Sequence, residues 1–151
     1  MINFAQLDLV HLSANVATVL FMVFIGAQLL AAAGVLPVSM FWGGRKTELT
    51  PSLRIMGVVA AVLLSAFIYV IRYRAGLVGS MPLPTAVRVG AWLVTGYMAL
   101  NVLGNFASKS PVEKFLFGPL TILLTVSCLI VVASSNSEAL IRRVHQLGQP
   151  P

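Results

Sequence analysis

The chain has 151 residues, of which 58% are hydrophobic and only 9% are charged. Soluble domains carry about 25% charged residues, so this composition, with a mean hydropathy of +0.94, excludes an ordinary soluble fold. The net charge of +6 does not indicate nucleic-acid binding, because the ten basic residues are spread over the ends of four apolar runs and form no basic stripe with interleaved aromatics.

Those four apolar runs are each long enough to cross a lipid bilayer, since 18 or more uncharged residues in a row are typical of a transmembrane helix. They extend over about residues 12–36, 53–71, 86–106 and 111–133. The sequence therefore predicts an all-α, polytopic membrane protein, a four-transmembrane-helix bundle with short loops. A polar tail over residues 134–151 is expected to form a short amphipathic helix on the membrane surface.

The first span is preceded by a polar stripe at helical spacing, formed by Asp8, His11 and Asn15. Pro37 is expected to end this span, because proline cannot continue the backbone hydrogen bonding of a helix. The pair Phe41-Trp42 follows at the depth of the membrane interface, where amphipathic aromatic rings prefer to lie.

The second span begins with favourable local chemistry, since Thr50 can cap the helix and proline follows at its first position. Inside it, Gly57, Ala61 and Ser65 recur at every fourth residue. Small residues at this spacing allow another helix to approach closely, so they form a candidate helix-packing face and docking surface. The charged run that starts at Arg72 is expected to stop this helix.

The third span is expected to be capped by Thr85. Before the fourth span, Ser110 and Glu113 match a capping box with a proline between them at the first helical position. Gly118-Pro119 lies inside this span. A helix that began at Pro119 would reach only about 22 Å, too short to cross the hydrocarbon, so a continuous helix kinked at Pro119 is predicted.

A polar stripe runs along the third span and has a counterpart on the fourth. Its members fall at i, i+4, i+8 and i+11 on one helix face: Tyr97, Asn101, Asn105 and Ser108. The counterpart consists of Thr121, Thr125 and Cys128. An amide in hydrocarbon costs several kcal/mol unless it is hydrogen-bonded, so the stripe should face protein or water. It either lines a path or ligand site between helices three and four, or bonds these helices together, and the second interpretation is favoured because such contacts are common in bundles.

Groups that could carry chemistry are scarce. No ionisable residue lies in the middle of a span, which disfavours a proton-coupled transporter or a voltage sensor. No protease, nucleotide-binding or metal signature is present, and a single cysteine cannot form a thiol redox pair. We therefore expect no enzymatic activity, no metal and no cofactor. A haem held by His11 and His145 is a third hypothesis, disfavoured because His145 lies in the polar tail.

The second half of the chain, over about residues 97–133, carries Ala99-Leu100-Asn101-Val102-Leu103-Gly104-Asn105, then Ser108-Lys109-Ser110, Glu113-Lys114 and Gly118-Pro119. This stretch resembles a group of small bacterial four-helix inner-membrane proteins with no assigned activity. The resemblance implies a multi-pass protein of the bacterial cytoplasmic membrane. The Asn-x-x-Gly stretch is also similar to the asparagine-bearing helix of small fluoride channels. Their Thr-Phe-Ser-Thr-Phe element is absent here, so that function is not carried over.

The expected function is an accessory or partner-binding subunit of a bacterial inner-membrane assembly. Its partners would be the lipid bilayer and another membrane protein or a second copy of the chain, without nucleic acid. The alternative is a small oligomeric channel or carrier for a neutral or weakly charged solute, lined by Asn101 and Asn105. An even number of spans places both termini on one side. The ten basic residues divide equally between the two sides, so their count leaves the orientation open, and the charges that flank the first span, Asp8 before it and Arg45-Lys46 after it, favour termini outside.

Overall fold

The computed structural model describes residues 4–46, 48–80 and 82–134, and the expected amphipathic tail lies outside these residues except for its first position. The described residues form helices and loops and contain no strand. The elements in chain order are α1 (Phe4–Ala33), η1 (Val38–Met40), η2 (Trp42–Gly44), α2 (Pro51–Arg74), α3 (Thr85–Ala107), η3 (Glu113–Phe117) and α4 (Gly118–Ala133). The predicted all-α four-helix bundle is confirmed.

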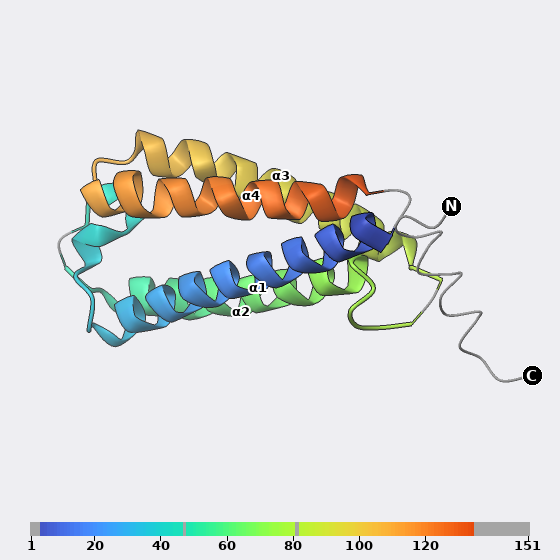
Figure 1. Ribbon diagram of the computed structural model, residues 1–151. Helices are drawn as coiled ribbons and strands as arrows, with labels where there is room; N and C mark the ends of the chain where they lie inside the picture. Colours follow the sequence, from blue (N-terminus) through green and yellow to red (C-terminus); the bar gives the residue numbers. More distant parts are fainter. Residues whose placement is uncertain (1–3, 47, 81, 135–151) are drawn as a thin grey trace, which may run out of the picture.

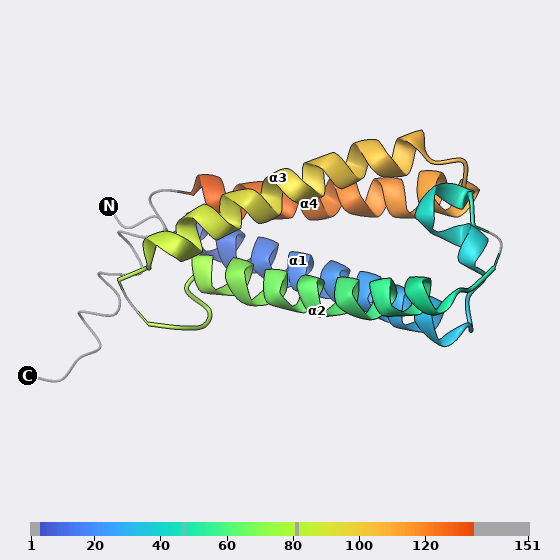
Figure 2. The same ribbon diagram turned by 180° about the vertical axis from the view of Figure 1, so that it is seen from behind.

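The four helices run alternately up and down (Figure 1). Helix α1 packs against α2 and α4, and α3 packs against the same two helices, so the bundle follows the chain order around its axis. Seen from behind, α2 and α3 form the near face (Figure 2). We call the end that carries the α1–α2 and α3–α4 connections the loop end. The opposite end, where α1 begins and α4 finishes, is the terminal end.

The outer surface of the bundle is apolar, as expected for helices that lie in lipid. Four helices are long and apolar enough to cross a membrane. Large side chains such as Leu93 and Leu100 are about two-thirds exposed, at 68% and 67%. In water such a surface would be unfavourable, whereas in hydrocarbon it is the preferred one. The chain is therefore a four-span integral membrane protein.

The terminal half of the bundle is filled by a packed apolar core. Phe21 from α1, Leu124 from α4 and Met98 from α3 are buried together there, and small residues such as Ala14 and Ala91 let the helices approach. A separate buried group, formed by Ala31, Phe41 and Phe117 with its neighbours, lies toward the loop end. Between these two groups the packing is less complete, and this is where the pocket described below lies.

The carboxyl-terminal ends of α1 and α2 are set by glycine rather than by the proline and charges that the sequence suggested. Helix α1 ends at Ala33 because Gly34 adopts a φ of +83°, and its N–H and that of Val35 bond to the carbonyls of Ala31 and Leu30. Helix α2 ends in the same way at Gly76. This is the Schellman arrangement, in which a residue with positive φ satisfies the last carbonyls. Basic side chains are favourable in the last turn of a helix, where the partial charge is negative, so α2 continues through Arg72 and Arg74.

The ends of the other helices also differ in part from expectation. Helix α1 begins at Phe4, ahead of the span expected from about residue 12, because a helix can continue beyond the hydrocarbon once its polar side chains face water or headgroups. Thr50 caps α2 as predicted and accepts a hydrogen bond from the N–H of Leu53 at 3.3 Å. Thr85 is not a cap, since Pro84 occupies that position and makes no side-chain bond.

Two arginines of α2 satisfy the carboxyl ends of neighbouring helices. Arg54, at the start of α2, donates to the carbonyl of Ala32 in the last turn of α1 at 3.2 Å. Arg74, at the end of α2, is buried and donates to the carbonyl of Val132 in α4 at 3.0 Å. The last carbonyls of a helix lack partners within it and carry partial negative charge. These basic residues therefore hold the bundle together as well as marking the membrane interface.

Candidate functional site

The site is built around a set of hydrogen bonds that tie the first loop to the α3–α4 connection, which we call the junction clamp. It consists of Met40, Gly43, Ser108, Ser110 and Glu113. The hydroxyl of Ser110 donates to the carbonyl of Met40 at 3.0 Å, and the N–H of Gly43 donates to the Glu113 carboxylate at 3.0 and 3.3 Å. The clamp joins segments that are far apart in sequence and fixes the loop end of the bundle.

Only half of the predicted capping box is present. Ser110 accepts the N–H of Glu113 at 3.4 Å, as a cap should. The expected return bond from the Glu113 carboxylate to the N–H of Ser110 is absent, because that N–H donates to the hydroxyl oxygen of Ser108 at 2.9 Å. The carboxylate instead accepts the Ser108 hydroxyl and the N–H of Gly43. The Glu113 carboxylate therefore bonds to the first loop and to Ser108 instead of capping the start of its own helix.

The fourth span is continuous across Gly118-Pro119, and the proline is accommodated by a π-helical turn. Residues Glu113–Phe117 form this turn, and the N–H of Gly118 bonds to the carbonyl of Glu113, five residues earlier. Proline has no N–H, and its ring would press on the carbonyl of Phe115 in a regular α-helix. A wider turn relieves both problems and is a common feature of functional sites. Here it turns Glu113 and Phe117 toward the interior of the bundle.

Trp42 is held in an unusual backbone conformation beside this turn. Its φ is +59°, and the two glycines that follow have φ values of +76° and +67°. For a bulky residue this region costs of order 1–3 kcal/mol and persists only where the surroundings enforce it. The clamp enforces it, because Gly43 is bonded on both its N–H and its carbonyl, and Gly44 leaves no room for a side chain beside Ser110.

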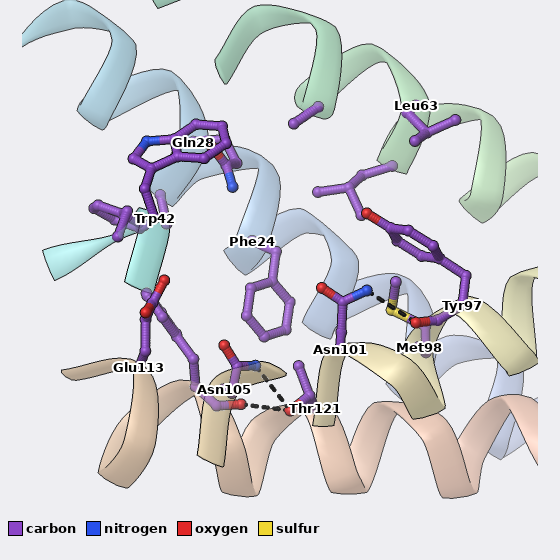
Figure 3. Close-up of a pocket in the computed structure, with 15 residues that line it drawn as sticks. Phe24, Gln28, Trp42, Leu63, Tyr97, Met98, Asn101, Asn105, Glu113 and Thr121 are labelled. Atoms are coloured by element: carbon purple, nitrogen blue, oxygen red, sulfur yellow. Dashed lines mark hydrogen bonds between the residues drawn. The ribbon is translucent and has the colours of Figure 1, made fainter. Parts of the chain in front are cut away.

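The pocket lies inside the loop-end half of the bundle and has a volume of about 240 Å³. It is bounded by α1, α2, α3, the η2 turn and the beginning of the fourth span (Figure 3). Its polar wall consists of Gln28, Tyr97, Asn101, Asn105, Glu113 and Thr121. Its apolar wall consists of Phe24, Ala27, Phe41, Trp42, Ala60, Leu63, Leu64, Met98 and Phe117. The sequence suggested a site between helices three and four alone, whereas all four helices contribute.

The predicted polar stripe is divided between two roles. Asn105 donates its Nδ2 to Thr121 at 3.1 Å and so bonds α3 to α4, as the structural interpretation expected. Asn101 donates its Nδ2 to the carbonyl of Tyr97 on its own helix at 2.9 Å and reaches no neighbouring helix through this bond. Tyr97, Asn101, Asn105 and Thr121 all line the pocket.

The remaining stripe residues lie elsewhere. Ser108 belongs to the junction clamp. Thr125 bonds to the carbonyl of Thr121 on its own helix, and Cys128 is fully buried in the apolar core. These two residues do not line the pocket.

The hydrogen bonds also fix which way the two asparagine amides point. A backbone carbonyl only accepts, so the Asn101 group that bonds to Tyr97 must be the NH₂. The hydroxyl of Thr121 already donates to the carbonyls of Phe117 and Gly118 at 2.8 Å, so it must accept from the NH₂ of Asn105. The amide oxygens of Asn101 and Asn105 therefore point toward the space around Phe24, as Figure 3 shows.

Gln28, Trp42 and Glu113 are among the pocket residues that were not identified as site residues from the sequence. Gln28 lies in an uncharged span without a repeating polar pattern, and its Oε1 is buried with no hydrogen-bond partner among the described residues. Trp42 was assigned to the membrane interface and Glu113 to a helix cap. The signal that could have identified Gln28 is its isolation, since a lone amide in the carboxyl-terminal part of an apolar span needs a partner.

The small residues of α2 pack inside the bundle instead of forming an open docking surface. A side chain at Gly57 would lie 3.1 Å from the Cβ of Ala32 and from the carbonyl oxygen of Gln28, both on α1. Ala61 is also buried. Ser65 is exposed and bonds to the carbonyl of Ala61 on its own helix. The face predicted for a partner is therefore occupied by α1 at Gly57.

The polar stripe at the start of α1 forms a separate group near the terminal end. Asn15 and Thr18 accept hydrogen bonds from Arg72 at 3.1 and 3.4 Å. The Nε2 of His11 is buried without a hydrogen-bond partner in the described part of the chain, and His145 lies outside that part. Within the described ranges, no three residues of the His, Cys, Asp and Glu types gather closely enough to hold a metal ion.

The site thus combines a strained tryptophan, a carboxylate and several amide oxygens around a small space inside the membrane domain. These groups can accept hydrogen bonds and can contact an apolar body, but they offer no nucleophile paired with a base. No known family model, curated protein or solved structure matches the chain.

Proposed function

We propose that this protein is a non-enzymatic, membrane-embedded carrier that binds one compact, neutral or weakly charged solute in the loop-end pocket. We place it in the bacterial cytoplasmic membrane, in line with the resemblance of its second half. One observation carries the proposal: the amide oxygens of Asn101 and Asn105 border a pocket within the spans instead of bonding to a neighbouring helix.

Energetics support a ligand at this place. A buried acceptor without a partner costs about 1–3 kcal/mol, and Gln28 Oε1 is in this condition among the described residues. A bundle that needed only to be stable would gain by replacing such groups with apolar ones of similar size. The amide oxygens of Asn101 and Asn105 also lack a bond to a neighbouring helix, and a solute that donates hydrogen bonds to them would supply these bonds when it binds.

A carrier fits the packing better than an open pore. The terminal half of the bundle is filled by fully buried side chains such as Phe21 and Leu124. Passage through one chain would require these helices to move apart, or a second copy of the chain to complete a path. Movement of helices around a central site is the usual principle of small carriers.

Binding can be tested with the pocket's own tryptophan. The chain has two tryptophans, and Trp92 lies on the outer surface of α3, 53% exposed. In a Trp92→Phe background, fluorescence of purified protein in detergent reports on Trp42. A panel of small neutral, anionic and cationic solutes should contain at least one that changes this fluorescence saturably. Asn101→Leu should abolish that change, and Ser65→Ala, on the outer side of α2, should not.

Transport is then measured in proteoliposomes with the solute found in this way. Flux should exceed that of protein-free vesicles and should fall to their level for Asn101→Leu with Asn105→Leu. Flux that is unchanged in this double variant, or a panel without any saturable binding, would refute the carrier.

A second candidate, an accessory subunit, is favoured by the outer face of α2. Within the most apolar window of each span, α2 buries only 17% of its residues in the bundle, against 44% for the fourth span. That face could pack against another membrane protein or against a second copy. Purification in mild detergent would then yield a stoichiometric complex or a homo-oligomer, and a stable monomer that retains solute binding would exclude this role.

A further inference from the structure

We infer that the solute is a compact organic ammonium ion with N–H donors, and that the Glu113 carboxylate is its counter-charge. This inference rests on the proposed solute-binding function and specifies the class of solute. It follows from the charge, the hydrogen-bonding character and the shape of the pocket walls.

Charge is the first argument. Among the described residues that line the pocket, Glu113 is the only carboxylate, and no lysine, arginine or histidine is present. Glu113 is bonded to two neutral donors, the Gly43 N–H and the Ser108 hydroxyl. Neutral donors hold a carboxylate in place without cancelling its charge, so among the described lining residues the one formal charge is the negative charge of Glu113.

Hydrogen-bonding character is the second argument. The NH₂ groups of Asn101 and Asn105 donate to the Tyr97 carbonyl and the Thr121 hydroxyl. Both amide oxygens therefore face the pocket. The oxygens that face the pocket are therefore these two amide oxygens and the Glu113 carboxylate, whereas the donors of the lining are neutral groups of Gln28, Trp42 and Tyr97. An ammonium group has only donors and can bond to these oxygens, whereas a carboxylate or phosphate would be repelled by Glu113.

Aromatic rings supply the third argument. Phe117 contacts Phe24 and Phe41, with ring centroids 5.4 and 5.5 Å apart, and Trp42 and Tyr97 complete the aromatic lining. The faces of such rings attract cations, tryptophan most strongly. Rings also offer an apolar surface for the hydrocarbon part of a ligand, which a hydrated metal ion would not use. The volume of about 240 Å³ lies below the range of about 300–1,000 Å³ that drug-sized ligands occupy.

The test is a titration of the Trp92→Phe protein with matched probes. Butylammonium, cyclohexylammonium and 2-phenylethylammonium carry the proposed group on different bodies. 2-Phenylethanol and 3-phenylpropanoate present a similar body with a neutral or an anionic head, and sodium chloride supplies an inorganic cation. At least one ammonium ion should bind at least about tenfold more tightly than the neutral and anionic probes.

Glu113→Gln should weaken ammonium binding by about tenfold to hundredfold, the range expected for loss of a charged hydrogen bond. Glu48→Gln is the matched control, since Glu48 is an exposed carboxylate in the first loop. Because Glu113 also belongs to the clamp, Asn101→Leu provides a second variant that leaves the clamp intact. It should weaken ammonium binding while the binding of 2-phenylethanol changes less.

The outcomes separate this inference from the function on which it rests. Saturable binding of neutral or anionic probes without any preference for ammonium ions would overturn the inference and keep the carrier. Binding of sodium ions at the same site, with no ammonium binding, would also overturn it. Absence of binding by every probe in the wider solute panel would refute both.

Discussion

Asn105 illustrates how one residue can belong both to the bundle and to its pocket. Its NH₂ bonds α3 to α4 through Thr121, while its oxygen faces the pocket. Asn105→Val should remove the interhelical bond and destabilise the bundle by about 0.6–2 kcal/mol, the range measured for such bonds in membranes. Unfolding in mixed micelles with increasing SDS, followed by far-UV circular dichroism, measures this. Thr125→Val is the control, because Thr125 bonds only within its own helix; equal losses would contradict the assignment.

Gly57 is the position at which α2 comes closest to α1 without room for a side chain. Gly57→Ala would place a methyl group 3.1 Å from the Gln28 carbonyl oxygen and the Cβ of Ala32. Backbone atoms cannot move aside as the ends of flexible side chains can. The helices α1 and α2 should therefore separate, which should lower the free energy of unfolding by about 1–3 kcal/mol. Gly96→Ala, which meets nothing within 4 Å, should be neutral or stabilising by up to about 1 kcal/mol. The same SDS titration compares the two, and an equal loss in both would contradict the assignment of the effect to the contact between α2 and α1.

The junction clamp is the element that shapes the pocket, because it fixes both η2 and the π-helical turn. Ser110→Ala removes its bond to the Met40 carbonyl and the cap of the fourth span. We expect a loss of about 1 kcal/mol in stability and faster amide hydrogen exchange over residues 38–45, with α2 unaffected. Ser39→Ala, at an exposed position in the same loop, should change neither quantity. Unchanged exchange in Ser110→Ala would show that the loop is held by other contacts.

The helices themselves could be predicted from the sequence because lipid imposes a simple rule: a long charge-free stretch must satisfy its own backbone. The carboxyl-terminal ends of α1 and α2 could not, since they depend on local conformation. Gly34 and Gly76 end α1 and α2 by adopting positive φ, and a pattern of charges or prolines does not reveal this. Pro119 was correctly placed inside a continuous span, but the π-helical turn that accommodates it depends on the contacts of Glu113 with another loop.

The pocket was predicted in part, for a related reason. Asn101 and Asn105 stand out because amides are costly in hydrocarbon and recur at helical spacing. Gln28 and Glu113 join them only after the bundle brings α1 and the π-helical turn together. In its own segment, Gln28 is an isolated amide and Glu113 is a helix cap, so no local pattern could assign them to one site. The long-range packing that brings them together cannot be seen in the sequence.

At the scale of the whole molecule, the alternating helices fix which loops share a side of the membrane. Lys46 and Lys109 are exposed at the loop end, and Ser80 is exposed in the α2–α3 connection at the terminal end. In a Cys128→Ala background, a membrane-impermeant maleimide should therefore label Lys46→Cys and Lys109→Cys from one side and Ser80→Cys from the other. Reporters fused to the two termini should agree with Ser80→Cys. With termini outside, as the charges around the first span favour, only Ser80→Cys would react in intact cells. Labelling of Lys46→Cys and Ser80→Cys from the same side would mean that α2 does not cross the membrane. It would also contradict a pocket formed between four spanning helices.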